Sequence, residues 1–174
     1  MNALTDKRSQ RLNDLRQLMA EVGFDGWIIG REDMYQGDEV PASEERLAYL
    51  SGFTGSAGFA VVLREIAGLF SDGRYSLQME AQTSKDDWQC NTIPDVTCED
   101  WLKAKQLPDG FIIGIDGRLV TVSNFDRFER AIRDAGGKLV SHSENLLDTI
   151  WTFRQLQPPG KIWQMPKKFA GKTI

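Results

Sequence analysis

Residues 58–71 read Gly58-Phe59-Ala60-Val61-Val62-Leu63-Arg64-Glu65-Ile66-Ala67-Gly68-Leu69-Phe70-Ser71. Two apolar runs, 58–63 and 67–71, flank a short charged turn. Apolar runs of this length, separated by only a few turn residues, are typical of an antiparallel β-hairpin. The stretch therefore predicts two paired strands that lie side by side in a sheet.

Outside the hairpin, amphipathic helices alternate with apolar strands. In residues 6–22 the apolar side chains recur every three or four positions, which indicates a helix, and Gly23 lies where a left-handed residue would end it. A second such stripe begins near Ser123, which can cap the helix start together with Asp126. Residues 31–45 are polar and interrupted, which predicts a long loop.

The complete pattern predicts an α/β domain with a mixed β-sheet and helices packed on it. Strands that alternate with helices, together with one hairpin, give a layered α/β fold. The expected helices are 6–22, 75–83, 99–106, 123–135 and 145–151, and the expected strands are 27–30, 58–63, 67–71, 88–93, 111–116 and 138–141.

The composition excludes several classes of protein. The chain has 174 residues, of which 41% are hydrophobic, and this size suits one domain with a buried core. Its net charge of −4 gives no support to a nucleic-acid-binding face, which needs clustered basic residues. No apolar stretch approaches the roughly 18 residues that mark a membrane-spanning helix, and the N-terminus lacks the apolar core of a signal peptide. We therefore expect a cytoplasmic protein that binds neither nucleic acid nor membrane.

Few residues of this chain suit catalysis. His142 is its single histidine, and serine nucleophiles and zinc sites ordinarily need one or more imidazoles. Cys90 and Cys98 do not form a C-x-x-C motif and are too few for a disulfide framework, so we expect reduced thiols. The sequence therefore indicates a chain that is poorly equipped for catalysis by itself.

The glycine-rich stretch from Gly52 to Gly58 is the most conspicuous local pattern. It lacks the Walker and dinucleotide-binding patterns, and Thr54 stands where a nucleophile elbow around Ser56 would need its first glycine. A tight backbone approach into the following strand is the simpler interpretation. A hydrolase built on Ser56, with His142 as its base, is the remaining enzymatic alternative.

Asp72-Gly73-Arg74-Tyr75 follows the second strand of the hairpin. Asp-Gly is a favoured turn pair, so these residues predict a turn that leads into the next helix. A guanidinium presented on a rigid turn is suited to bind a carboxylate or a backbone carbonyl. Arg74 is therefore the candidate binding residue of the chain.

Several segments together resemble a known family. The stretches from Asp33 to Pro41, from Arg46 to Gly58 and from Ser71 to Tyr75 are similar to the N-terminal domain of Xaa-Pro aminopeptidases, the creatinase/prolidase N-terminal domain. Later landmarks, Gly114-Ile115-Asp116 and Asn145 to Trp151, follow in the same order. The resemblance extends from about residue 10 to residue 171.

The resemblance implies a fold, an activity and a role for Arg74. The fold is a mixed sheet with a ribonuclease H-like motif, and the domain contributes to dimer formation and to the active-site entrance. The parent enzyme removes the N-terminal residue before a proline, and uses two divalent metals, usually manganese, held by a C-terminal domain absent from this chain. The resemblance therefore implies no catalytic residue and no metal ligand in this chain. The arginine of the Asp-Gly-Arg-Tyr motif reaches toward the bound peptide in this family, and that position is Arg74 here.

This chain also departs from the family pattern. Tyr35 stands where many members have His, and Asp38-Glu39 stands where they have Glu-Tyr. The usual Asp-Arg-Pro does not follow Trp151, where Thr152-Phe153-Arg154-Gln155 stands instead. These departures leave open whether the loop around Tyr35 has a role toward substrate.

The domain boundary follows from the resemblance and from a composition change. Residues 1–151 form the expected first domain, and residues 152–174, which include Pro158-Pro159-Gly160, form a linker and the start of a second domain. A stand-alone interaction module without peptidase activity is the alternative function.

Overall fold

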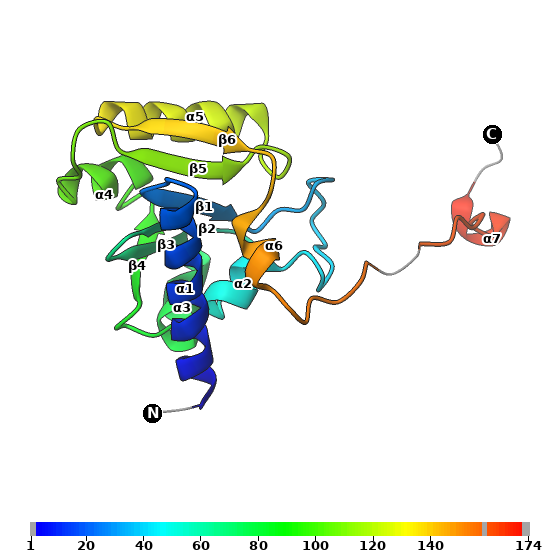
Figure 1. The fold of residues 1–174 in the computed structure, drawn as a ribbon. Coiled ribbons are helices and arrows are strands. Elements are labelled where there is room, and N and C mark those ends of the chain that lie inside the picture. The colour runs from blue at the N-terminus through cyan, green and yellow to red at the C-terminus, as the bar shows by residue number, and fades with distance from the viewer. Residues whose placement is uncertain (1–2, 158–159, 172–174) are drawn as a thin grey trace.

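Six strands form one mixed sheet at the centre of the molecule (Figure 1). The computed structural model describes residues 3–157 and 160–171, and its side chains from Lys7 onward. The strand order across the sheet is β4-β3-β2-β1-β5-β6. The strands are β1 (Gly26–Gly30), β2 (Phe59–Leu63), β3 (Ala67–Asp72), β4 (Trp88–Ile93), β5 (Ile112–Asp116) and β6 (Lys138–His142).

The predicted hairpin is confirmed, and it organises the sheet. β2 and β3 pair antiparallel with Phe59 opposite Phe70, and β1 pairs antiparallel with β2 on the other side. All remaining neighbours, β3 with β4, β1 with β5 and β5 with β6, are parallel. Only β2 therefore runs against the other five strands of this sheet, and the predicted mixed α/β sheet is confirmed.

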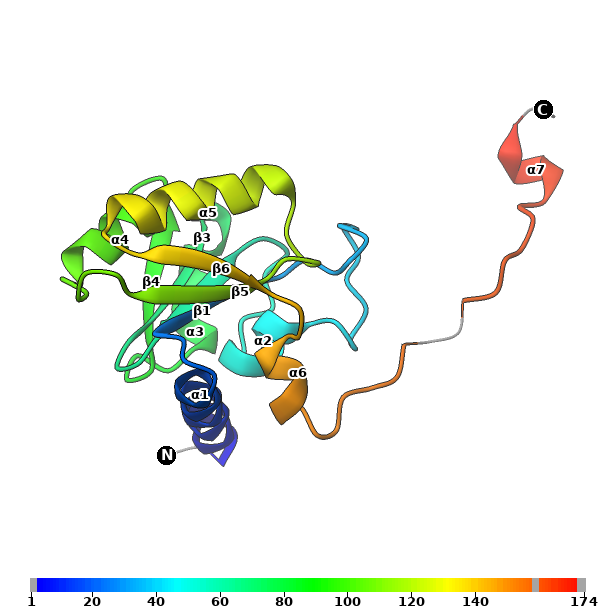
Figure 2. The same cartoon turned by 45° about the horizontal axis from the view of Figure 1, so that its top comes forward.

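Helices cover both faces of the sheet. One face carries α1 (Ala3–Glu21), α2 (Arg46–Ser51), α3 (Ser76–Gln82) and α6 (Leu146–Ile150), and the other carries α4 (Cys98–Ala104) and α5 (Val122–Asp134). In Figure 2 α5 and α1 lie on opposite sides of the strands. Both faces of β2 and β3 are buried, which is why these strands are almost continuously apolar.

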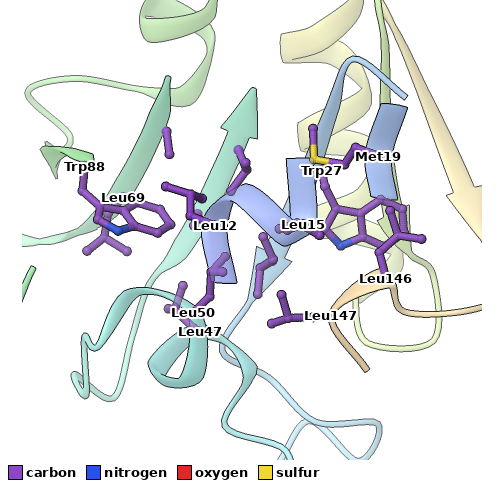
Figure 3. Packing of buried hydrophobic residues seen from close by; sticks show 14 of the residues in the cluster. Leu12, Leu15, Met19, Trp27, Leu47, Leu50, Leu69, Trp88, Leu146 and Leu147 are labelled. Atoms are coloured by element: carbon purple, nitrogen blue, oxygen red, sulfur yellow. The ribbon is translucent and has the colours of Figure 1, made fainter. Parts of the chain in front are cut away.

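The apolar stripe of α1 anchors one of the two cores. Leu12, Leu15 and Met19 are fully buried against Trp27 of β1 and against leucines of α2 and α6, as Figure 3 shows. Burial of each such side chain stabilises the fold by about 1.5–3 kcal/mol. Gly23 adopts φ +81°, which confirms that the helix ends in a left-handed residue.

Two local features differ from the sequence-based expectation. α2 was not predicted, and it begins directly after the predicted loop of residues 31–45. The start of α5 is capped by Thr121, whose side chain accepts the backbone N–H of Asn124, and the predicted cap Ser123 lies inside the helix. Serine and threonine are both favoured N-cap residues, so residue type alone does not distinguish Ser123 from Thr121.

A ring of buried and partly buried charges ties the chain beyond Trp151 back to the domain. Arg154 reaches Glu44 with Nη2 at 2.7 Å and Asp148 with Nη1 at 2.7 Å. Arg46 reaches the same two carboxylates, Glu44 at 2.6 Å and Asp148 at 2.7 Å. Gln157 adds a hydrogen bond to Glu44 at 2.9 Å. The contacts of the first domain therefore continue through Gln157, six residues past its expected end at Trp151.

Residues 160–171 extend away from the domain, as Figures 1 and 2 show. Their side chains are exposed, including the apolar ones of Ile162, Trp163 and Phe169, and their one helix is the short α7 (Lys167–Ala170). Several large apolar side chains exposed within one short segment are unusual for the surface of a soluble monomer.

Candidate functional site

The carboxyl ends of five strands meet at one edge of the sheet. β1, β3, β4, β5 and β6 run in the same direction, so the loops that follow them lie together, next to the start of β2. In open α/β sheets this carboxyl edge is where ligands bind. Arg74 lies on the loop after β3 and therefore belongs to this edge.

Arg74 is held by the aspartate two residues before it. Its Nε and Nη2 donate to the two carboxylate oxygens of Asp72 at 2.9 and 2.8 Å, and its backbone N–H donates to Oδ1 at 3.0 Å. The Arg74 side chain is 70% exposed. Its third nitrogen, Nη1, has no partner among the described residues. The predicted turn is confirmed as a short 3₁₀ segment, Gly73–Tyr75, capped by Asp72.

The pairing sets the charge state of this turn. The hydrogen bonds from Arg74 lower the pKa of the Asp72 carboxyl to about 2. Asp72 is therefore ionised at neutral pH, and the Asp72–Arg74 pair carries no net charge. A neutral pair with one free amino group is suited to donate a hydrogen bond to a neutral oxygen such as a peptide carbonyl.

Tyr75 and Ser56 form a second contact at this edge. Their hydroxyl groups lie 2.5 Å apart, and this hydrogen bond lowers the pKa of the Tyr75 phenol. The Arg74 guanidinium lies over the Tyr75 ring at 5.1 Å from its centroid, within the range of a cation–π contact. Phe53 meets the same ring edge to face at 5.9 Å. Together these contacts fix the orientation of the turn.

The glycine-rich stretch brings the backbone close to β3. A Cβ at Gly58 would lie 2.7 Å from the carbonyl oxygen of Phe70, and Gly58 also has φ +147°. Gly52 ends α2 in the left-handed conformation with φ +85°. The close approach predicted for this stretch is confirmed, because a side chain at Gly58 would force the two strands apart.

The structure does not pair Ser56 with His142. The partner of the Ser56 hydroxyl is Tyr75, while His142 Nδ1 lies 2.8 Å from the carbonyl oxygen of Glu144. The imidazole packs edge to face against Phe24 and Trp27. The described contacts therefore give no support to a hydrolase built on Ser56.

The two cysteines are not bonded to each other. Cys90 and Cys98 are both free thiols, and burial raises the pKa of the Cys98 thiol to about 12. A thiol with so high a pKa is unreactive at neutral pH.

The loop after β1 is organised around a buried carboxylate. Asp33 accepts the backbone N–H groups of Tyr35 at 2.9 Å and Gly37 at 3.3 Å. Gln36 donates to the carbonyl oxygen of Leu119 at 3.1 Å and so ties this loop to the loop after β5. The Tyr35 side chain itself is 76% exposed at this edge. Tyr35 is thus placed where it could meet a partner, which its sequence position alone does not show.

A second Asp-Gly-Arg tripeptide, 116–118, lies at the end of β5. Arg118 Nε and Nη2 donate to the two oxygens of Asp116 at 3.0 and 2.9 Å, and its backbone N–H donates to Oδ1 at 3.0 Å. These contacts repeat those of Arg74 atom for atom. Sequence reasoning treated only the first tripeptide as a candidate site, although the repeat Asp-Gly-Arg is visible in the sequence.

No group of three or more histidine, cysteine, aspartate or glutamate residues in the described part of the chain is placed to hold a metal ion. At the carboxyl edge, the carboxylates of Asp72 and Asp116 are occupied by arginines. Within the same residues, no helix has the length and apolar character needed to cross a bilayer.

Comparison with known proteins gives a consistent family. The profile of the creatinase/prolidase N-terminal domain matches residues 11–155. A protein named "Probable Xaa-Pro aminopeptidase P" from Pyrenophora teres is 38% identical over 168 residues, which cover 94% of this chain but 25% of that protein. The chain therefore spans about a quarter of the length of this relative.

Solved structures show the same fold. The X-prolyl aminopeptidase of Caenorhabditis elegans, described as a cytosolic enzyme with a di-nuclear active site, is 29% identical with a TM-score of 0.76, and the match covers 86% of this chain and 26% of that one. The N-terminal domain of the cytoplasmic peptidase PepQ from Mycobacterium tuberculosis is 26% identical with a TM-score of 0.60, over 81% of this chain and 98% of that one. With the family profile covering most of the sequence and the fold shared, this chain belongs to the creatinase/prolidase N-terminal domain family.

Proposed function

We propose that this chain is the non-catalytic N-terminal domain of a cytoplasmic Xaa-Pro aminopeptidase, which removes the N-terminal residue of a peptide whose second residue is proline. The observation that carries the proposal is the coverage: a match over 94% of this chain accounts for 25% of a relative that bears the name of this peptidase. The rest of such a protein is free to hold the catalytic centre.

The metal chemistry of the proposed parent lies outside this chain. The C. elegans neighbour is described as having a di-nuclear active site. The residues of this chain do not fit such a centre, because its described part holds no cluster of three candidate ligands. Two divalent metals, manganese in our proposal, would be bound by the catalytic part of the parent.

In this proposal Arg74 is the substrate-binding residue of the domain. Asp72 fixes the guanidinium by two hydrogen bonds, and Nη1 is left to donate to a carbonyl oxygen of the peptide. A fixed guanidinium loses little conformational freedom when a ligand binds, so the contact favours binding more than a free side chain would. The domain would also contribute to a homodimer of the parent and to the entrance of its active site.

The first test is the reading frame that contains this chain. A frame that continues past Ile174 into a segment with two aspartates, one histidine and two glutamates as metal ligands supports the proposal. A frame that ends at Ile174 contradicts it and favours the stand-alone interaction module.

The second test is kinetic. The purified 174-residue chain should not hydrolyse an Xaa-Pro peptide in the presence of Mn²⁺, while the full-length protein should. In the full-length protein we expect Arg74→Ala to lower kcat/KM by about tenfold, because a hydrogen bond from a charged donor is lost. Measurable metal-dependent hydrolysis by the 174-residue chain would refute the non-catalytic assignment, and an unchanged kcat/KM would remove the role of Arg74.

A further inference from the structure

The two Asp-Gly-Arg turns of this domain are structural copies at the same edge of the sheet. One follows β3 and the other follows β5, and both strands run parallel to β1. In each turn the aspartate accepts the backbone N–H of the arginine and binds its Nε and Nη2, at distances between 2.8 and 3.0 Å. In each turn these hydrogen bonds form within the tripeptide itself.

Both turns leave the same nitrogen available. Arg74 is 70% exposed and Arg118 is 61% exposed, and Nη1 of each has no partner among the described residues. Asp116 is 2% exposed, so the β5 turn is anchored more deeply than the β3 turn. A buried carboxylate that holds an exposed guanidinium in one orientation is a means of presenting a donor to something outside the domain.

A further exposed Asp–Arg pair lies away from this edge. Arg64 is 63% exposed and meets Asp25 through Nη2 at 2.8 Å. It belongs to the turn between β2 and β3, at the opposite edge of the sheet. Arg64 therefore provides a matched control: an exposed arginine paired with an aspartate, but far from the carboxyl edge.

The spacing of the two turns matches an extended peptide. β3 and β5 are separated by β2 and β1, which makes three strand spacings, or about 14 Å, across the sheet, and the strand registers also offset the two turns along the strand direction. An extended chain advances about 3.3–3.6 Å per residue, so this distance corresponds to about four residues or more. A dipeptide that contacts Arg74 would be too short to reach Arg118.

We propose that Arg118 is a second peptide-binding residue, which donates from Nη1 to a backbone carbonyl of the peptide held by Arg74, about four or more residues along. This proposal rests on the proposed function and deepens it, because it makes the domain favour longer peptides over dipeptides. The specificity would act through binding, so it would appear in KM and not in kcat.

The surroundings of Arg118 favour a carbonyl over a carboxylate. Asp116 neutralises its charge, and Glu144 adds negative charge nearby, whereas Asp148 is already paired with Arg46 and Arg154. A free peptide carboxylate therefore gains little attraction here, and an uncharged carbonyl oxygen is not repelled by Glu144. The terminal carboxylate of the peptide therefore should not be required.

The experiment compares two substrates in the full-length protein, an Xaa-Pro dipeptide and an octapeptide that begins with Xaa-Pro. For Arg118→Ala we expect KM for the octapeptide to rise about threefold to tenfold with kcat nearly unchanged, and KM for the dipeptide to stay as it is. Arg118→Lys keeps a positive charge beside Asp116 but lacks the forked guanidinium, and should show the same pattern. Arg64→Ala should leave both substrates unaffected.

Melting temperatures and peptide chemistry complete the test. Arg118→Lys should melt close to the unaltered protein, so a KM change in that variant is not a folding effect. An octapeptide amide should lose as much affinity as the acid. An unchanged octapeptide KM in both variants, an equal rise for the dipeptide, or a rise confined to the acid would each overturn the inference. Absence of hydrolysis by the unaltered protein would instead overturn the proposed function on which it rests.

Discussion

At the scale of single residues, arginine–carboxylate pairs occur both at the candidate site and among the contacts that hold the domain together. At the carboxyl edge, exposed guanidiniums are fixed by Asp72 and Asp116. Beneath the loop after β1, Arg46 is only 5% exposed and bridges Glu44 and Asp148. A buried pair of this kind adds little over an apolar pair, but loss of one member leaves an uncompensated charge.

Arg46→Met should therefore destabilise the domain by about 3–5 kcal/mol, because it leaves the buried Glu44 and the partly buried Asp148 with Arg154 as their one remaining cation in this ring. Lys103→Ala, which removes an exposed pair with Glu99, should cost less than about 0.5 kcal/mol. Urea unfolding at pH 7 measures both. Equal stability of the two variants would show that the buried ring contributes no more than a surface pair.

The same ring gives a pH dependence. Burial raises the pKa of Glu44, but hydrogen bonds from Arg46 and Gln157 outweigh burial and leave it below its ordinary value of 4.5. The stabilisation is thus fully present above pH 4.5 and is lost as the pH falls through the lower folded value. In Arg46→Met this loss on acidification should be smaller than in the unaltered domain, as urea unfolding at pH 7 and pH 4 would show.

At the scale of elements, the sequence predicted those whose burial pattern is local. The hairpin and α1 follow from apolar runs and from the spacing of Leu12, Leu15 and Met19. α2 was missed because it has six residues and no side-chain cap at Glu45. Its stability comes from the buried Leu47 and Leu50 and from ion pairs of Arg46, which are tertiary contacts that a local pattern does not contain.

The start of α5 allows a test of which residue caps the helix, Thr121 or Ser123. Thr121→Ala should cost about 1 kcal/mol, because the N–H of Asn124 loses its acceptor. Ser123→Ala should be neutral or slightly stabilising, because Ser123 lies within the helix, where alanine is favoured. Thermal unfolding of the two variants gives the comparison, and the reverse order would restore Ser123 as the cap.

At the candidate site, too, local features could be predicted from the sequence and tertiary ones could not. The turn at Asp72-Gly73-Arg74 was predictable, because Asp-Gly specifies a turn and the arginine follows it directly. That Arg118 shares an edge with Arg74 depends on the strand order and on the parallel pairing of β1 with β5. Strand order is set by packing among distant segments, so the spatial relation of the two turns could not be deduced from their identical sequences.

At the scale of the whole molecule, the question is where the folded domain ends. The sequence placed the end at Trp151, at the change of composition. Trp151 stacks on Tyr49 with ring centroids 4.3 Å apart, and Arg154 then closes the ring of charges with Glu44 and Asp148. Between these residues Phe153 projects outward and is 94% exposed. The segment is fixed by its polar contacts while its apolar side chain remains free for whatever part of the polypeptide follows.

Truncation decides between the two boundaries. A chain that ends at Gln157 keeps both Arg154 and its contacts, so its unfolding free energy should equal that of the 174-residue chain within about 0.5 kcal/mol. A chain that ends at Trp151 leaves Glu44 and Asp148 with Arg46 alone, and should be less stable by about 1–3 kcal/mol. Arg154→Ala in the 174-residue chain should reproduce most of that loss.

If both truncated chains have the unfolding free energy of the 174-residue chain, the contacts of Arg154 add no stability, and the boundary at Trp151 holds. If only the chain that ends at Trp151 has a lower unfolding free energy, the rigid domain extends through Gln157, and Arg154 fixes the segment by which the chain leaves it.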